Sequence, residues 1–219
     1  MTLTLHAHPF SSYSWKAMIA LYEAETPFES VLLDQATFGA FKALWPIGKF
    51  PVLVDDTRGQ TVPEASIIIE YLDLHYPGAE RLLPEDPDAR LDMRLLDRFF
   101  DNYVSTPQQK IVADRMRAPQ AHDQQGVDDA RAMLATSYRW LDDRMATRIW
   151  AAADMFSLAD CGAGPFLFYA DWVQPIDATH PHLKAYLARL RDRPSVKRAI
   201  DGARPYRHLF PGGVPDHAD

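Results

Sequence analysis

The sequence predicts a mixed α/β half followed by an all-helical half. Between residues 1 and 78, short apolar runs of strand length alternate with segments of helical periodicity. From residue 88 onward, the apolar residues recur with helical spacing throughout. Segment 77–88 places three prolines among charged residues, which is typical of a linker. We therefore expect two domains, residues 1–78 and residues 88–219.

The elements of the first half follow from alternating and helical patterns. Leu3 and Leu5 alternate with threonines, which indicates a strand, and the polar segment after it leads into a helix. That helix is expected to begin near Tyr13 or Ser14 and to end at Pro27. The remaining predicted elements are a strand over 28–34, an irregular helix over 35–46, a hairpin of strands 51–56 and 60–62, and a helix over 64–76.

The second half is predicted to be a series of helices. One long helix is expected over 88–117, with a bend near Pro107. The tail from Pro205 is rich in proline and glycine, and we expect it to lie along the surface. The other predicted helices lie over 127–147, from Ser157 onward, over 181–192 and over 194–203.

Composition and charge argue against several classes of protein. The net charge is −7, from 23 basic and 30 acidic residues, and no basic run appears, so no nucleic-acid partner is expected. Neither a bilayer-spanning apolar run nor a secretion signal is present, so no membrane partner is expected. Cys161 is the single cysteine, and no internal disulfide can form. These observations favour a cytoplasmic protein.

The segment FSSYSWKAMIAL, residues 10–21, carries the first candidate chemistry. Ser11 and Ser12 stand between a strand and a helix, where backbone amides lack partners and the helix dipole is positive. A hydroxyl at this point can donate a hydrogen bond to an anion such as a thiolate. The alternative, which local sequence alone favours, is that the serines only cap the helix.

Two further motifs follow in the same half. Pro51 begins a strand, and a cis bond to Phe50 would turn the Phe50 backbone towards an extended peptide ligand, whereas a trans bond is the commoner state. Glu64 and Ser66 flank the start of the next helix. Ser66 is a candidate cap, and its backbone amide can donate a hydrogen bond to a carboxylate. Glu64 is suited to an ammonium group. A ligand with both groups, such as an amino acid, fits this end.

Taken in order, these motifs resemble the glutathione transferase family, together with Lys16 and the IIIEYL run. FSLADCGAGP, residues 156–165, resembles the capping box of the family, with Ser157 as the cap and Asp160 three residues on. The resemblance covers nearly the whole chain. It implies a thioredoxin-like domain followed by a helical-bundle domain, in a homodimer.

The resemblance also implies roles for residues. Glutathione would be the co-substrate, and no metal would be needed. The serine that holds the thiolate is Ser12 by the theta-like and delta-like pattern, or Ser11 by the zeta-like string SSCSWR. Tyr13 stands in place of the cysteine in that string, which argues against maleylacetoacetate isomerase activity and makes Tyr13 a third candidate donor. The expected glutathione-binding residues are Lys49, Phe50, Pro51, Glu64, Ala65 and Ser66.

The implied activity is attack of the glutathione thiolate on a small, largely apolar electrophile, as in detoxification. The alternatives are a glutathione-dependent isomerase or peroxidase that uses the same site, and a non-catalytic binding or regulatory protein. A pocket for the apolar co-substrate is expected from Tyr13, Phe100, Tyr103, Met116 and Tyr169.

Several other residues are interpreted as structural. His6 and His8 share one strand face without further ligands, so a zinc site is not expected. Cys161 is predicted to be a buried staple residue at the start of its helix. Asp97 and Asp101 share a helix face that we expect to be solvated.

Overall fold

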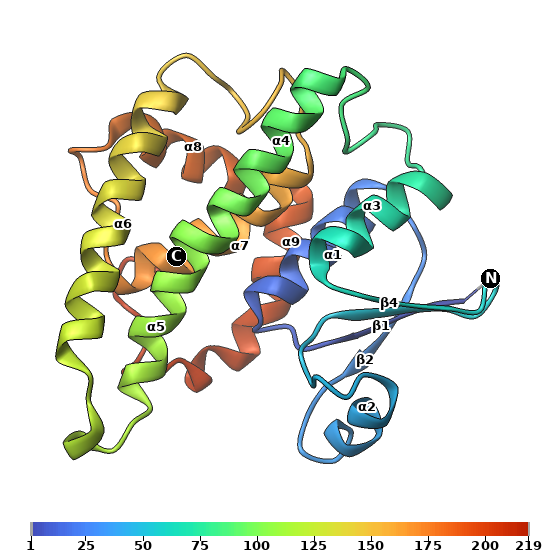
Figure 1. Cartoon of the computed structure of the whole chain (residues 1–219), viewed down its shortest axis with the longest axis horizontal. Coiled ribbons are helices and arrows are strands. Elements are labelled where there is room, and N and C mark those ends of the chain that lie inside the picture. Colours follow the sequence, from blue (N-terminus) through green and yellow to red (C-terminus); the bar gives the residue numbers. More distant parts are fainter. Residues whose placement is uncertain (1, 219) are drawn as a thin grey trace.

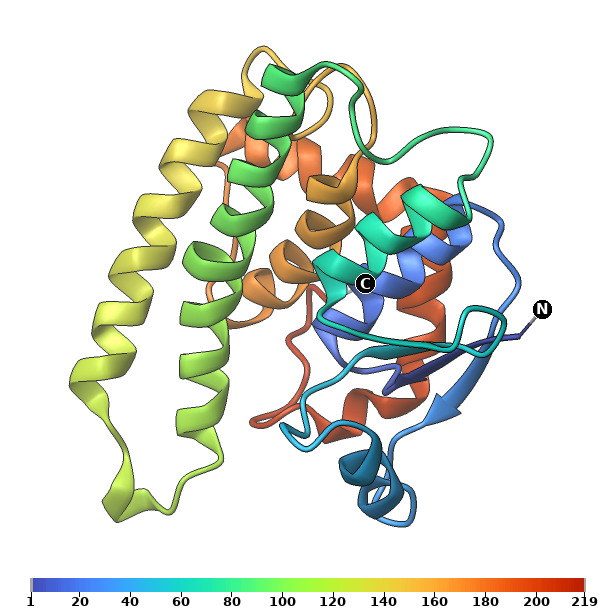
Figure 2. The ribbon, with the colours of Figure 1, turned by 45° about the vertical axis from the view of Figure 1, so that its right-hand side comes forward.

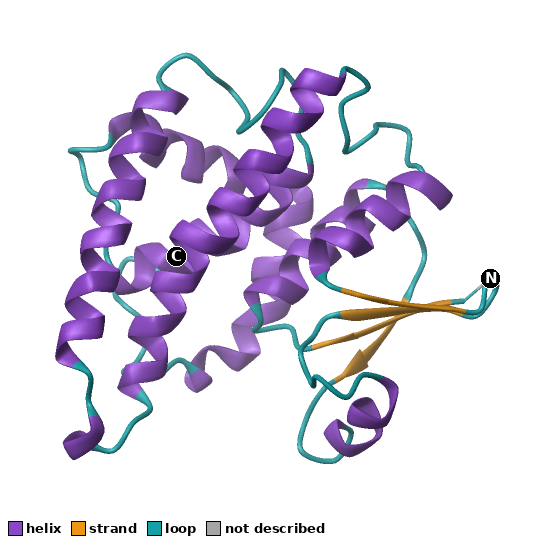
Figure 3. Ribbon diagram, viewed as in Figure 1, coloured by secondary structure: helices purple, strands orange, loops and turns teal. Residues whose placement is uncertain are grey.

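The computed structural model describes residues 2–218, and its first part contains a four-stranded mixed sheet (Figure 3). The spatial order of the strands is β2-β1-β3-β4. β1 pairs with β2 in parallel, whereas β1–β3 and β3–β4 are antiparallel pairs. The strands span Leu3–Ala7 (β1), Glu29–Leu32 (β2), Val52–Asp55 (β3) and Gln60–Pro63 (β4).

Helices cover both faces of this sheet (Figure 1). α1 (Ser12–Glu23) and α3 (Ala65–His75) lie together on one face, and α2 (Phe38–Leu44) lies on the other. The two faces have separate cores, because a small cluster around Phe41 is distinct from the large cluster that continues into the second domain. This is the thioredoxin-like arrangement that the resemblance implies.

The second part is helical throughout, and its centre is α7, in which every residue is buried. α7 packs against α1, so the two parts share one hydrophobic core. No helix within residues 2–218 is long and apolar enough to cross a membrane. The elements are α4 (Pro87–Phe99), η1 (Phe100–Ser105), α5 (Thr106–Arg115), η2 (Pro119–Ala121), α6 (Gln124–Met145), α7 (Leu158–Val173), α8 (Pro181–Asp192), α9 (Pro194–Ala203) and η3 (Arg204–Leu209).

The long helix predicted over 88–117 is present as α4, η1 and α5 (Figure 2). Its irregular part is a π-helical segment over residues 100–105, just before the proline at which we expected a bend. Pro107 has no N–H, so the carbonyl of Tyr103, four residues earlier, lacks its usual helical donor. Ser137 of α6 donates to that carbonyl at 2.8 Å. The irregular segment is therefore stabilised from the neighbouring helix.

The capping box predicted at the start of α7 is present. Ser157 is the N-cap, and Asp160 accepts hydrogen bonds from both the backbone N–H and the hydroxyl of Ser157 at 2.9 Å. Phe156 and Cys161 are buried on either side, as expected for staple residues. Burial raises the pKa of the Cys161 thiol well above its usual value, so this cysteine is structural.

Candidate functional site

A cavity of about 690 Å³ lies between the thioredoxin-like and helical parts. It brings together residues from the first turn of α1, the segment before β3, the start of α3, the α4–α5 region and the tail. From the first part it is lined by Phe10, Ser11, Ser12, Tyr13, Gly48, Lys49, Phe50, Pro51, Glu64 and Ala65. From the second part it is lined by Arg98, Asp101, Asn102, Gln108, Gln109, Val112, Met116, Tyr169, Leu209, Phe210 and Pro211.

The three candidate thiolate donors all lie where α1 begins. Ser11 is the N-cap, and its hydroxyl oxygen accepts the Ser14 N–H at 3.3 Å, so the capping role is real and leaves the hydroxyl hydrogen free to donate. Ser12 is the first helical residue. Burial raises the pKa of the Tyr13 hydroxyl, which therefore keeps its proton at neutral pH and can act as a donor.

The segment before β3 also lines this cavity. The peptide bond between Phe50 and Pro51 is cis, which is the less common of the two states considered from the sequence. Gly48 has a φ of 69°, a conformation that favours glycine, and this turn brings Lys49 and Phe50 to the cavity wall. The Phe50 ring packs edge-on against Phe41 at 6.4 Å, which anchors the segment to the smaller core.

The start of α3 differs from the expectation in one respect. The N-cap is Glu64 and not Ser66, and the Glu64 side chain makes no capping hydrogen bond. The Ser66 hydroxyl instead donates to Asp97 Oδ2 at 2.9 Å, and Ser66 is absent from the cavity lining. The α3 end of the cavity is therefore lined by the exposed Glu64 and by Ala65.

Glu64 has a strained backbone, with φ of 70° and ψ of 120°. We expect Glu64→Gly to stabilise the free protein by up to about 1 kcal/mol, because glycine accepts this conformation without a Cβ clash. The same change is expected to weaken glutathione binding, because the carboxylate is lost. Glu64→Gln is the matched control: it keeps the strain and should weaken binding without raising the melting temperature. Equal melting temperatures for both variants would contradict the strain argument.

A buried group of charges lies beside the cavity. Lys16 of α1 is fully buried, and its Nζ lies 2.5 Å from Asp97 Oδ1 and 2.9 Å from Asp101 Oδ1. The expectation of a solvated acidic face is therefore wrong, since both aspartates are buried against this lysine and Arg98. Burial alone would raise the pKa of Asp97, but the charges and hydrogen bonds of Lys16 and Arg98 together outweigh it and hold that pKa below its usual value.

The far wall of the cavity is apolar, and only some of the residues predicted for the co-substrate pocket line it. Tyr13, Met116 and Tyr169 line it, whereas Phe100 is in the core and Tyr103 is 45% exposed on the outside. The tail, expected on the surface, supplies the missing wall through Leu209, Phe210 and Pro211. Phe210 is buried, and Arg115 of α5 holds this segment by donating to the Pro211 carbonyl at 3.2 Å. Phe10 packs edge-on against Tyr169 at 5.5 Å.

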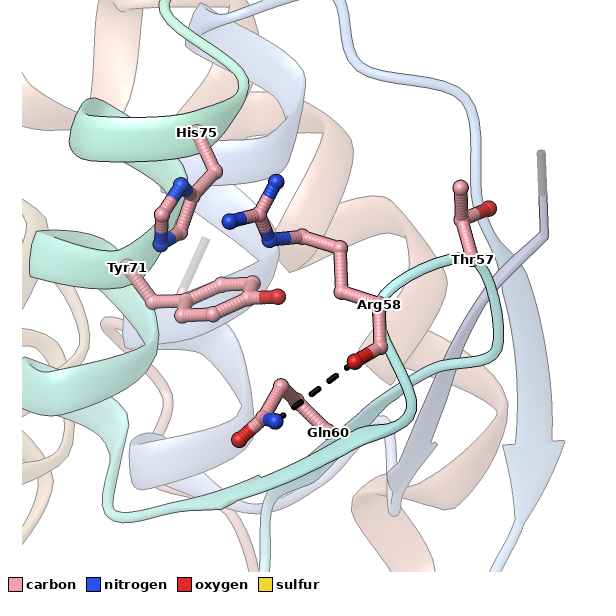
Figure 4. A pocket seen from close by; sticks show the side chains of 5 residues that line it. All are labelled: Thr57, Arg58, Gln60, Tyr71 and His75. Atoms are coloured by element: carbon pink, nitrogen blue, oxygen red, sulfur yellow. Dashed lines mark hydrogen bonds between the residues drawn. The ribbon is translucent and has the colours of Figure 1, made fainter.

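A smaller recess of about 350 Å³ lies at the opposite end of α3 (Figure 4). Its lining residues come from the β3–β4 turn and the C-terminal half of α3, and they are Thr57, Arg58, Gln60, Tyr71 and His75. Beneath it, Tyr71 and Tyr76 donate to the buried Asp55 at 2.7 and 2.6 Å. None of the candidate site residues is in this recess, so the inter-domain cavity is the candidate site.

Comparisons with known proteins identify the family of the chain. The family model "Glutathione S-transferase, N-terminal domain" matches residues 5–80, and the corresponding C-terminal domain model matches residues 124–189. The structure resembles a glutathione S-transferase from Methylobacterium radiotolerans, solved in complex with glutathione sulfonate. That likeness has a TM-score of 0.79 and 29% identity over 91% of this chain and 95% of that one.

Two curated relatives cover nearly the full length. The chain is 26% identical to glutathione S-transferase GstB of Escherichia coli, over 90% of this chain and 97% of that protein. It is 28% identical to FtsZ-localized protein A of Caulobacter vibrioides, over 89% of each. A thioredoxin-like domain, a helical domain and a cavity between them define the class of glutathione-transferase-like proteins. The chain belongs to the glutathione S-transferase family.

Proposed function

We propose that the protein binds glutathione in the inter-domain cavity and activates its thiol for attack on a small, largely apolar electrophile. The observation that carries the proposal is the composition of this one cavity. One side combines the hydroxyl donors of α1, the Phe50 backbone and the start of α3. The other side is the apolar wall that contains Tyr169 and Phe210. A peptide thiol and an apolar partner would thus meet in one place.

The proposed chemistry depends on ionisation of the thiol. A free thiol has a pKa near 8.5, and lowering it by about two units requires roughly 2.7 kcal/mol of preferential thiolate stabilisation. A hydroxyl donor together with the positive end of the α1 dipole supplies energy of this order. The thiol proton passes to solvent, the sulfur forms a bond to the electrophilic carbon, and the leaving group departs with its bonding electron pair.

Relatives support both this proposal and its alternative. The Methylobacterium radiotolerans enzyme holds glutathione sulfonate, which supports glutathione as the ligand here. The name of FtsZ-localized protein A describes where that protein is found and not a reaction. This relative therefore supports a non-catalytic role as the second candidate function. The isomerase and peroxidase readings, a detoxifying role, the homodimer, the cytoplasmic location and the domain limits 1–78 and 88–219 stay predictions.

The test is calorimetric titration with glutathione, with thiolate absorbance followed against pH in the same sample. We expect saturable binding and a bound-thiol pKa about two units below the free value of roughly 8.5. S-methylglutathione, which has no thiol, is the control and should bind without the absorbance change. Binding with an unshifted thiol pKa would favour the non-catalytic role, and no binding at millimolar glutathione would refute the proposal.

A further inference from the structure

Arg98 of α4 is held in a fixed position at the cavity wall. Its Nη2 donates to Ser66 Oγ at 2.8 Å and to Asp97 Oδ2 at 2.6 Å, and it lies 2.5 Å from Asp101 Oδ2. Its Nε donates to Asp97 Oδ2 at 3.2 Å. Within residues 2–218, Nη1 makes no hydrogen bond, and 55% of the side chain is exposed. The anchored guanidinium thus keeps two N–H groups for a ligand.

The part of the cavity nearest Arg98 needs a positive group if an anion is to bind there. Ala65 supplies a backbone amide at the start of α3 but no side-chain donor. The Ser66 hydroxyl is already engaged with Asp97 and Arg98. Among the residues that line the cavity, the only Lys or Arg side chains are Lys49 and Arg98. Because Ser66 links α3 directly to Arg98, Arg98 is the cation beside this helix N-terminus.

We infer that Arg98 binds the α-carboxylate of the γ-glutamyl end of glutathione, in place of the Ser66 hydroxyl. The inference rests on the proposed function. A guanidinium whose orientation is set by three anchors loses little conformational freedom on binding a carboxylate, and its hydrogen bonds are charge-assisted. The exposed carboxylate of Glu64 remains for the ammonium group on the same carbon.

This arrangement gives the helical domain a direct part in binding glutathione. Asp97, Asp101 and Ser66 act as positioning residues, because they orient the guanidinium and leave Nη1 for the ligand. Lys16 balances one aspartate charge and Arg98 the other, so the group of four is neutral and Nη1 of Arg98 can donate to a ligand while both aspartates stay paired. The amino-acid end of the ligand would then be clamped between α3 and α4 of the same chain.

The experiment compares two ligands on four proteins by calorimetry. The ligands are glutathione and 4-aminobutanoyl-cysteinylglycine, which lacks only the α-carboxylate. The wild-type protein is expected to bind glutathione about 10- to 100-fold more tightly than the analogue. Arg98→Gln should bring the two affinities within about threefold of each other, mainly by weakening glutathione binding. Arg98→Lys keeps the charge but loses the fork geometry, so it should retain an intermediate preference.

Arg94→Gln is the matched control. Arg94 is on the same helix and also forms an ion pair with α3, through Glu70, but it does not line the cavity. It should leave the affinity for both ligands within about twofold of wild type. If Arg98→Gln loses the same amount of affinity for both ligands, the inference is overturned, because a purely structural role of Arg98 does not discriminate between them.

The wild-type comparison stands even if Arg98→Gln does not fold. A wild-type preference below about threefold would overturn the assignment of Arg98 while leaving glutathione binding intact. A wild-type protein that binds neither ligand would instead refute the proposed function itself. The two failures are therefore distinguishable in one series of titrations.

Discussion

Replacing Asp160 with alanine is expected to lower the free energy of unfolding by about 3–5 kcal/mol. The Asp160 carboxylate is fully buried and accepts from Ala151 N at 2.9 Å and from Tyr186 Oη at 2.6 Å. It also accepts from both the backbone N–H and the hydroxyl of Ser157. Alanine would leave these donors buried without a partner and would remove the Asp160 half of the capping box of α7, the central helix.

Asp160→Asn keeps the shape of this side chain but removes its charge and one of its two acceptor oxygens. Each carboxylate oxygen serves two donors, and an amide must turn its NH₂ group towards one of these pairs. We therefore expect the asparagine variant to be destabilised, but less than the alanine variant. Urea unfolding followed by circular dichroism measures both. A cost below about 1 kcal/mol for alanine would show that the network is not critical to stability.

Removing the hydroxyl that holds the glutathione thiolate is expected to lower kcat/KM by about 10²–10³-fold. The loss should be accompanied by a rise in the pKa of the bound thiol towards the free value of roughly 8.5. The reason is that one directed donor in a partly buried site supplies much of the thiolate stabilisation. The measurements are turnover of an electrophilic substrate and thiolate absorbance against pH.

Three single variants separate the candidates for this hydroxyl. Ser11→Ala should also cost about 1 kcal/mol of stability, because Ser11 caps α1, whereas Ser12→Ala should not. Tyr13→Phe keeps the ring that packs on Phe166 at 4.9 Å and removes only the hydroxyl. An unchanged thiol pKa in all three variants would contradict the assignment of the thiolate site to the start of α1.

The order and type of the main elements could be predicted from the sequence because the signals are local. The hydrophobic spacing of α1, α3 and α6 and the prolines that follow α1 and α3 depend only on neighbouring residues. The Ser157–Asp160 capping box is likewise complete within four residues. The π-helical segment before Pro107 was expected only as a bend, because its stabilising donor, Ser137, is more than thirty residues away.

The candidate site could be predicted in part. All the named site residues except Ser66 line one cavity, since each lies next to the end of a strand or the start of a helix. Ser66 was expected to face the ligand, but its direction depends on Asp97 and Arg98 of a different domain. Arg98 itself carried no local signal, because one arginine on an amphipathic helix resembles any solvated residue.

The sequence by itself determined the two-part architecture, the cap of α7 and the position of the hydroxyl donors at the start of α1. Only the tertiary structure decided which charges are buried and which segment closes the cavity. Lys16 meets Asp101 across 85 positions of the chain, and Phe210 reaches the wall beside Phe10. An acidic helix face has the same pattern whether water or a lysine covers it, because periodicity identifies a face and does not identify its neighbour.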